Sequence, residues 1–231
     1  YRVIFTREEL LALPDDPGPV LGVFAARDTY NADSEEALAE AGLPVYNTNQ
    51  PRFDEMVATA LRILGRDAER RFLLVAEEEG TDNFSNSMNA AGMLEAMARA
   101  DAAIGQVLNW MSERPGQPLL LVVGADSDAG HPVTIAPRDA GPQDLLPDTS
   151  DSGAPLDGVA GTGGAPFVTA PDALGNRYPF GIAWPTSGDH QGSAVTRAHG
   201  FRAERLGTDV DNTAIYALLY RALFGREPGA P

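Results

Sequence analysis

Cysteine and lysine are absent from this chain of 231 residues, and histidine occurs only three times. Without cysteine the chain cannot form a disulfide scaffold, a thiolate zinc site or a cysteine nucleophile. Without lysine it cannot form a catalytic Schiff base or the phosphate-binding loop of a P-loop NTPase. Several enzyme classes are therefore excluded before any motif is considered.

Positive charge and long apolar runs are also scarce. The net charge is −16 and the isoelectric point is near 4.4, whereas nucleic-acid binding needs a basic surface, so we expect no nucleic-acid partner. No apolar run approaches the ~20 residues of a membrane helix, so we expect no membrane insertion. An apolar content of 43% is typical of one globular α/β domain or a large piece of one.

Short apolar runs alternate with amphipathic stretches along the first part of the chain. The runs 1–6, 20–25, 72–76 and 119–123 predict strands, the last three of them buried. The stretches 51–66 and 87–111 predict helices, because their apolar residues recur at helical spacing. This alternation predicts a three-layer α/β/α sandwich with a mostly parallel central sheet, whose functional groups gather at the carboxyl ends of the strands.

The later part of the chain changes character. Residues 131–185 form an insertion rich in Gly and Pro, which we expect to be a partly irregular excursion that covers the site as a lid; a disordered linker is the alternative. A last helix is predicted at 212–224. Because the chain opens inside a predicted strand, we expect it to be part of a longer protein, and a leader peptide cannot be judged from it.

Carboxylates follow the predicted strand at 72–76. The acidic run Glu77 to Glu79 precedes Asp82, and Asn86 follows four residues later. Crowded carboxylates repel one another unless a cation or an arginine neutralises them, so a metal site is one interpretation of this run. A helix beginning near Asp82 would place Asp82 and Asn86 on one face. The alternative is a solvated acidic turn in which Asp82 caps that helix.

Two further clusters follow the same logic. Asp126, Ser127 and Asp128 come directly after the strand at 119–123, either as metal ligands or as an ordinary turn. His190 lies in the Gly-rich loop 186–192, where an imidazole suits a metal ligand or a general acid but can equally be exposed. The contexts of His131 and His199 are weaker, and neither is assigned a role.

The order of these clusters resembles the C-terminal half of the alkaline phosphatase family. The family carries E-G-G-x-I-D-x-x-x-H, then T-A-D-H-E-x-G-G, then H-T-G, and closes with a D-N-T-x-I-F helix. The matching segments here are Glu77 to Asn86, Ala125 to Gly130, His190 to Gly192, and Asp211 to Tyr216, with Glu9 to Leu13 matching an earlier family helix. By this resemblance Glu77 is a magnesium ligand, and Asp82, Asp126 and His190 are zinc ligands.

The chain departs from the family at two ligand positions and in one whole segment. The family's zinc-binding histidines of the first two motifs are Asn86 and Ser127 here. Their neutral oxygens are poorer zinc ligands than imidazole and suit harder cations. The family's nucleophilic serine segment, D-S-A-x-x-x-T, does not occur in these residues. We therefore assign no catalytic residue; an alternative alignment, for example with His131 as a replacement imidazole, would restore a ligand.

The resemblance implies a function for the parent protein. By this resemblance we expect the parent protein to be a metal-dependent hydrolase of phosphate monoesters, with zinc and magnesium as cofactors. We expect this chain, one portion of its domain over residues 1–231, to be inactive alone. The implied partners are a small phosphate-ester substrate, the missing N-terminal part of the same protein and a second copy in a homodimer, in the periplasm or outside the cell. The rival is a degenerate, non-catalytic family member that acts as a binding or scaffold protein; a diester or sulfate-ester hydrolase is a further one.

Overall fold

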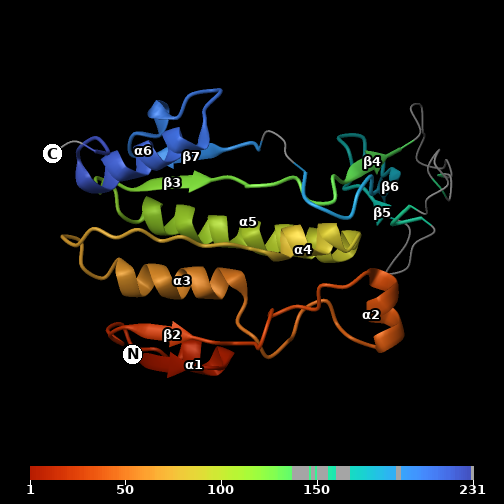
Figure 1. Cartoon of the computed structure of the whole chain (residues 1–231), viewed down its shortest axis with the longest axis horizontal. Coiled ribbons are helices and arrows are strands. Elements are labelled where there is room, and N and C mark those ends of the chain that lie inside the picture. The colour runs from red at the N-terminus through yellow and green to blue at the C-terminus, as the bar shows by residue number, and fades with distance from the viewer. Residues whose placement is uncertain (137–145, 147–148, 150–155, 160–166, 191–193, 230–231) are drawn as a thin grey trace.

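The computed structural model describes residues 1–136, 146, 149, 156–159, 167–190 and 194–229 (Figure 1). Its helices are α1 Arg7–Leu11, α2 Glu35–Ala41, α3 Phe53–Leu64, α4 Gly80–Asn86, α5 Ala90–Ser112, the 3-10 turn η1 Ala203–Arg205, and α6 Asn212–Phe224. Its strands are β1 Arg2–Ile4, β2 Val20–Gly22, β3 Leu120–Val123, β4 Val133–Ile135, β5 Phe167–Val168, β6 Pro179–Ala183 and β7 Arg197–Gly200. The helices predicted at 51–66, 87–111 and 212–224 are confirmed as α3, α5 and α6.

In the described part of the chain the strands form three small sheets rather than one. β1 and β2 pair in parallel, β3 and β7 pair antiparallel, and β6 pairs antiparallel with both β4 and β5. A mixed α/β fold is thus present, but a mostly parallel central sheet is not confirmed in the described part of the chain.

Two strand predictions need correction. Residues 72–76 are extended but form no strand, because their backbone has no pairing partner among the described residues. The strand predicted as buried at 20–25 covers only Val20–Gly22, and Leu21 within it is half exposed. In both places the apolar pattern correctly predicted extended chain. Burial on both faces was not found, because alternate side chains of each segment remain exposed.

Helices α3 and α5 pack together and form the main apolar layer. Val57 and Leu61 of α3 contact Ala103 of α5, and the side chains of Phe72 and Leu74 lie against this cluster. These residues recur at helical spacing on α3, which is why the helix buries that face. A second cluster packs α1 and β1 on the other side of α3. Helix α4 directly precedes α5 along the chain, so the packing of α5 against α3 also positions the side chains of α4.

The C-terminal region adds β6, β7 and α6. β4 and β6 fall within the insertion predicted at 131–185, whose residues 137–145, 147–148, 150–155 and 160–166 lie outside the described part of the chain. No helix in the described part combines the length and the apolar character needed to cross a bilayer.

Candidate functional site

Helix α4 begins directly after the extended acidic run, as the sequence predicted. Asp82 and Asn86 lie one turn apart on the same face, and the Asn86 Nδ2 group donates a hydrogen bond to Asp82 Oδ2 at 3.2 Å. The entry to the helix is tight, because a Cβ atom at Gly80 would collide with the Tyr46 hydroxyl group. Glycine at this position therefore lets the chain turn into α4 directly against the Tyr46 side chain.

The loops that carry the other two motifs converge on Asp82 and Asn86. The Ser127 hydroxyl donates to Asp82 Oδ1 at 3.3 Å, across 45 residues of sequence. Asn86 Nδ2 also donates to Asp189 Oδ1 at 2.8 Å. The two loops are tied to each other, because the Asp128 backbone N–H donates to the His190 carbonyl oxygen at 3.2 Å. All three motifs thus meet at one place.

Negative charge is concentrated around this meeting point. Partial burial raises the pKa of Asp82, and the nearby charges of Asp189 and Asp126 raise it further, against the lowering effect of the Ser127 and Asn86 hydrogen bonds. Desolvation likewise raises the pKa of Glu79, with added contributions from the charges of Glu77, Asp82 and Asp126. Three residues predicted as metal ligands, Glu77, Asp82 and Asp126, therefore share one electrostatic neighbourhood.

The fourth predicted ligand, His190, has a different neighbour. Its ring lies 5.8 Å from the ring of His131, centroid to centroid, with the two planes at 49°. His131 Nδ1 is 2.7 Å from Asp128 Oδ2. In the described part of the chain no hydrogen bond joins the His190 ring to Asp82. Residues 191–192 of the third motif lie outside the described residues.

Sequence reasoning assigned no role to His131 or Asp189, yet both lie at the cluster. Asp189 immediately precedes His190, and His131 follows Asp128 by three residues in the same loop. Their closeness in sequence to His190 and Asp128 was the one feature that could have indicated a place at the site. It could not show that the two loops face each other, because loop conformation is not fixed by local pattern.

The donor set does not fit a pair of zinc ions. No group of three or more His, Asp or Glu side chains in the described ranges is arranged to hold a metal ion. Zinc favours imidazole and thiolate, and at the matched positions only His190 offers an imidazole. The remaining donors are oxygens, including the buried Asn86 Oδ1, which has no hydrogen-bond partner among the described residues. Such oxygens suit a hard cation such as Mg²⁺ better than zinc, and the four assigned metal roles stay predictions.

A small cavity of about 180 Å³ borders the acidic run. Its lining residues include Glu77, Glu78 and Glu79 of the acidic run, together with Tyr46 and Arg99. Glu78 Oε1 accepts hydrogen bonds from the Tyr46 hydroxyl and the Gly80 backbone N–H, both at 3.1 Å, and burial raises the pKa of Glu78. The Arg99 guanidinium lies 3.4 Å from the centre of the Tyr46 ring, and its positive charge opposes the rise in the pKa of Glu78.

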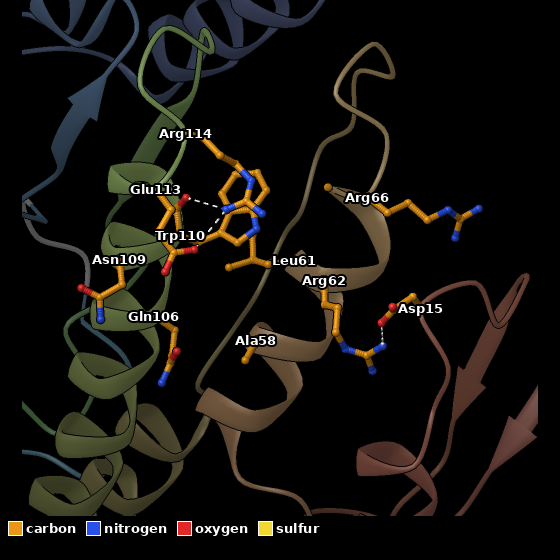
Figure 2. Close-up of a pocket in the computed structure, with 11 residues that line it drawn as sticks. Asp15, Ala58, Leu61, Arg62, Arg66, Gln106, Asn109, Trp110, Glu113 and Arg114 are labelled. Carbon is orange, nitrogen blue, oxygen red and sulfur yellow. Dashed lines mark hydrogen bonds and ion pairs between the residues drawn. The ribbon is translucent and has the colours of Figure 1, made fainter.

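A larger cavity of about 430 Å³ lies near the C-terminal ends of α3 and α5 (Figure 2). Its arginines have partners within the chain: Arg62 pairs with Asp15 at 2.9 Å, and the Arg114 guanidinium lies 4.2 Å from the Trp110 ring centre. None of the predicted site residues lines it. It therefore forms no part of the candidate site.

Comparison with known proteins places these observations in a family. A family model described as alkaline phosphatase matches residues 1–146, which include the first two motifs but not His190. No curated protein matches the chain.

Two similar solved structures are a His-to-Glu and a His-to-Asp variant of TAB5 alkaline phosphatase, each with Mg bound in its M3 site. They are 14% and 15% identical to this chain, with a TM-score of 0.51 in both cases. Each match covers 85% of this chain and 51% of the other, so the chain spans about half the length of these structures. At such low identity the likeness shows the fold alone.

Proposed function

Because this chain belongs to the alkaline phosphatase family, we propose that its parent protein is a metal-dependent hydrolase of phosphate monoesters. The observation that supports this best is the convergence of the three motifs. Ser127 and Asn86, from separate motifs, both donate to Asp82, and Asn86 also contacts Asp189 beside His190. The three motifs are far apart in sequence, and their meeting at Asp82 and Asn86 is what a site shared between them requires.

Within that proposal the chain supplies part of a site rather than a complete one. It positions a carboxylate, Asp82, and surrounds it with further carboxylates and two hydrogen-bond donors. It contains no D-S-A-x-x-x-T segment, so the attacking serine has to come from the remaining part of the parent protein. Because the donor set does not fit paired zinc ions, the proposal assigns no metal-dependent step to these residues.

We expect the 231-residue chain alone to show no turnover of p-nitrophenyl phosphate above a buffer control, and the parent protein to show it. The physical reason is that the chain lacks the family's nucleophilic serine segment. Asn86 and Ser127 cannot replace that serine, because they stand at the family's metal-ligand positions. Initial rates at equal molar concentrations test this, with p-nitrophenyl sulfate and a phosphodiester as controls for the ester class. A covalent phosphoserine trapped on the isolated chain would contradict the assignment.

A second candidate is a non-catalytic binding or scaffold protein that kept the fold. It is favoured by Asn86 and Ser127, because both oxygens of Asp82 are engaged by hydrogen bonds from these residues. A parent protein that is folded but hydrolyses none of the three esters would support it. The same assay thus separates the two candidates.

Family membership supports further proposals for the parent protein. These are cofactors that include magnesium and zinc, a small phosphate-ester substrate, a homodimer, and a location in the periplasm or outside the cell. The printed descriptions of the two similar structures name only magnesium. Of these proposals, magnesium agrees best with the oxygen donors at Asp82, Asn86 and Ser127.

A further inference from the structure

The cavity of about 430 Å³ between α3 and α5 lies outside the candidate site, and we call it the interhelix cavity. Figure 2 shows it between the last turns of the two helices, with Ala58 and Leu61 coming from α3 and Trp110 from α5. Small-molecule sites have volumes of roughly 300–1,000 Å³ and combine an apolar wall with a few polar groups that orient the ligand. The interhelix cavity is therefore large enough to hold a small molecule.

The apolar part of this cavity is formed by firmly packed side chains. Leu61 is buried, and Trp110 packs against the same cluster. The Trp110 ring meets the Phe72 ring edge-on, with centroids 6.1 Å apart and planes at 73°. Gly65, the residue after α3, leaves room for the indole, because a Cβ atom at this position would collide with it. These contacts hold the indole in place at the cavity wall.

Three arginines line the cavity close to the ends of the two helices. Arg62 is in the last turn of α3, Arg66 lies just beyond the end of α3, and Arg114 just beyond the end of α5. The Arg114 guanidinium lies 4.2 Å from the centre of the Trp110 ring. A chain with a net charge of −16 repels anions in general, so an anion would be held only where guanidinium groups gather in this way.

The loop that follows α1 shows how these arginines bind anions. Arg62 Nη1 donates to Asp15 Oδ1 at 2.9 Å, and Arg66 Nη2 lies 2.9 Å from Asp16 Oδ1. The two aspartates are consecutive in sequence, and their side chains are 85% and 71% exposed. Exposed ion pairs of this kind contribute little to stability. The carboxyl group of a ligand can therefore compete with these two carboxylates for the arginines.

Both arginines also have N–H groups that the loop does not use. A guanidinium carries five N–H groups. Arg62 donates to Asp15 and, from Nη2, to the Leu13 carbonyl oxygen at 3.0 Å, and Arg66 contacts Asp16 through Nη2. Among the described residues the Nε groups of Arg62 and Arg66 have no partner. Guanidinium groups bind carboxylate and phosphate with two parallel hydrogen bonds, so donors for a ligand are present.

We propose that the interhelix cavity binds a small organic anion that carries an aromatic ring. Its carboxylate or phosphate group accepts hydrogen bonds from Arg62 and Arg66, and its ring lies against Leu61 and Trp110. The aromatic ring is inferred from the wall, because an indole and the guanidinium stacked on it offer flat surfaces to a planar group. None of the predicted site residues lines this cavity, so the proposal does not rest on the proposed hydrolase function.

Titration of phenyl phosphate into the isotope-labelled chain tests the proposal, with NMR of its two tryptophan indole N–H groups as the readout. We expect the Trp110 signal to shift until it saturates. The Trp184 signal should stay in place, because Trp184 does not line the cavity. Trp110→Phe assigns the two signals. A Trp110 signal that does not move with either phenyl phosphate or benzoate would overturn the proposal.

Four further probes define the chemical class of the ligand. Inorganic phosphate lacks the ring and benzyl alcohol lacks the charge, so each should bind at least about tenfold more weakly than the better of the two aromatic anions. Benzylamine carries the opposite charge and should not bind. Benzoate compared with phenyl phosphate shows whether carboxylates or phosphate esters are preferred, and either preference supports the proposal. Equal binding of benzyl alcohol or of inorganic phosphate contradicts it.

Removal of the two arginines gives a second measurement. Arg62→Gln combined with Arg66→Gln should weaken binding of the aromatic anion at least about tenfold, because both guanidinium groups are lost. Arg27→Gln combined with Arg70→Gln is the matched control, since it removes two exposed arginines outside the cavity and changes the net charge equally. Equal weakening in the two variants would assign the effect to net charge and contradict the proposal.

A gain of binding is the sharpest test, because misfolding cannot produce it. Asp15→Asn combined with Asp16→Asn removes the competing carboxylates and should tighten binding about threefold or more. Glu40→Gln combined with Asp209→Asn is the matched control, with two exposed acidic groups removed outside the cavity. The alternative is that the arginines only secure the loop and the helix ends. In that case the Asp15 and Asp16 variant binds no anion more tightly than the control, and the proposal is overturned.

Discussion

Asn86 and Ser127 stand where the alkaline phosphatase family pattern has histidine, and the structure shows what they do instead. Each donates a hydrogen bond to a different oxygen of Asp82, at 3.2 Å and 3.3 Å. A hydrogen bond to a charged group contributes about 1.5–3 kcal/mol, so the two together offset part of the repulsion from Asp126 and Asp189. Asn86 and Ser127 therefore supply hydrogen bonds to both oxygens of Asp82, but neither offers the imidazole ligand that the family pattern has at its position.

Restoring one imidazole tests whether the position still faces a metal. We expect Asn86→His to bind zinc more than ~tenfold more tightly than the unchanged chain, because a zinc–imidazole bond is much stronger than a zinc–amide contact. The new ring would join Asp82 on the same face of α4. Isothermal titration with zinc measures the difference, and Ser127→His in the same background should strengthen binding further if two metals cooperate.

The matched control for this experiment is Asn109→His. Asn109 is exposed on α5 and lines the large cavity, far from the acidic cluster in sequence. A similar gain in that variant would mean that an added surface histidine explains the result. Equal zinc affinities for Asn86→His and the unchanged chain would mean that residue 86 does not face the metal, and the assignment of the first motif would be wrong.

Among the helices, α5 has an N-terminus held by side chains from three separate segments. Its first backbone N–H groups would otherwise lack partners, as at any helix start. Their acceptors are the Asp157 carboxylate for Ala90 at 3.3 Å, the Glu35 carboxylate for Ala91 at 2.7 Å, and the Asn89 amide for Gly92 at 2.7 Å. This junction therefore joins α2 and the segment around Asp157 to the longest helix of the chain.

Glu35 makes this junction sensitive to pH. Burial raises its pKa to about 7, the Ala91 N–H lowers it, and the charges of Asp157 and Glu36 raise it. In unfolded chain the pKa is near 4.5, so the folded state holds more protons between these values and the free energy of unfolding falls as pH rises from about 4.5 to 7. We expect Glu35→Gln to be more stable than the unchanged chain by about 1–3 kcal/mol at pH 8.

The advantage of Glu35→Gln should shrink to near zero at pH 4, where Glu35 is protonated in both states. Urea unfolding at the two pH values measures it, and glutamine can still accept the Ala91 hydrogen bond. Glu40→Gln, on the exposed side of the same helix, is the matched control and should change little at either pH. A destabilised Glu35→Gln at pH 8 would show that the ionised carboxylate is the favoured partner of the α5 N-terminus.

For the whole molecule, the sequence predicted helices better than sheets. The helix at 51–66 was recovered as Phe53–Leu64, and that at 212–224 as Asn212–Phe224, because amphipathic spacing and caps are local features. The run 72–76 was correctly taken as extended, yet it forms no strand. A strand is defined by its hydrogen-bonded neighbour, and no local pattern specifies whether that neighbour is present.

The candidate site shows the same division between local and non-local information. The shared face of Asp82 and Asn86 followed from their spacing of four, and it is confirmed. The contact between Ser127 and Asp82 was not predicted; the sequence indicated only that both residues follow strand-like runs, whose carboxyl ends gather functional groups. The contacts of Asp189 with Asn86 and of His131 with His190 were not predicted, because they depend on how two loops meet. The ligand roles of Glu77, Asp126 and His190 stay predictions.

The net charge of −16 leads to a final prediction at the scale of the whole molecule. Carboxylates number 33 against 17 arginines, so many acidic groups have no opposite charge to pair with. Raising NaCl from about 0.02 to 0.5 M shortens the Debye length from roughly 20 Å to roughly 4 Å, which screens this repulsion. Screening also weakens the exposed ion pairs, but each of these contributes only about 0–1 kcal/mol. We therefore expect the melting temperature at pH 8 to rise by a few degrees, as measured by circular dichroism.

The control is the same salt series near pH 4.4, the isoelectric point, where net repulsion vanishes and the rise should disappear. A melting temperature that falls with salt at pH 8, or rises equally at both pH values, would show that net charge does not limit the stability of this chain.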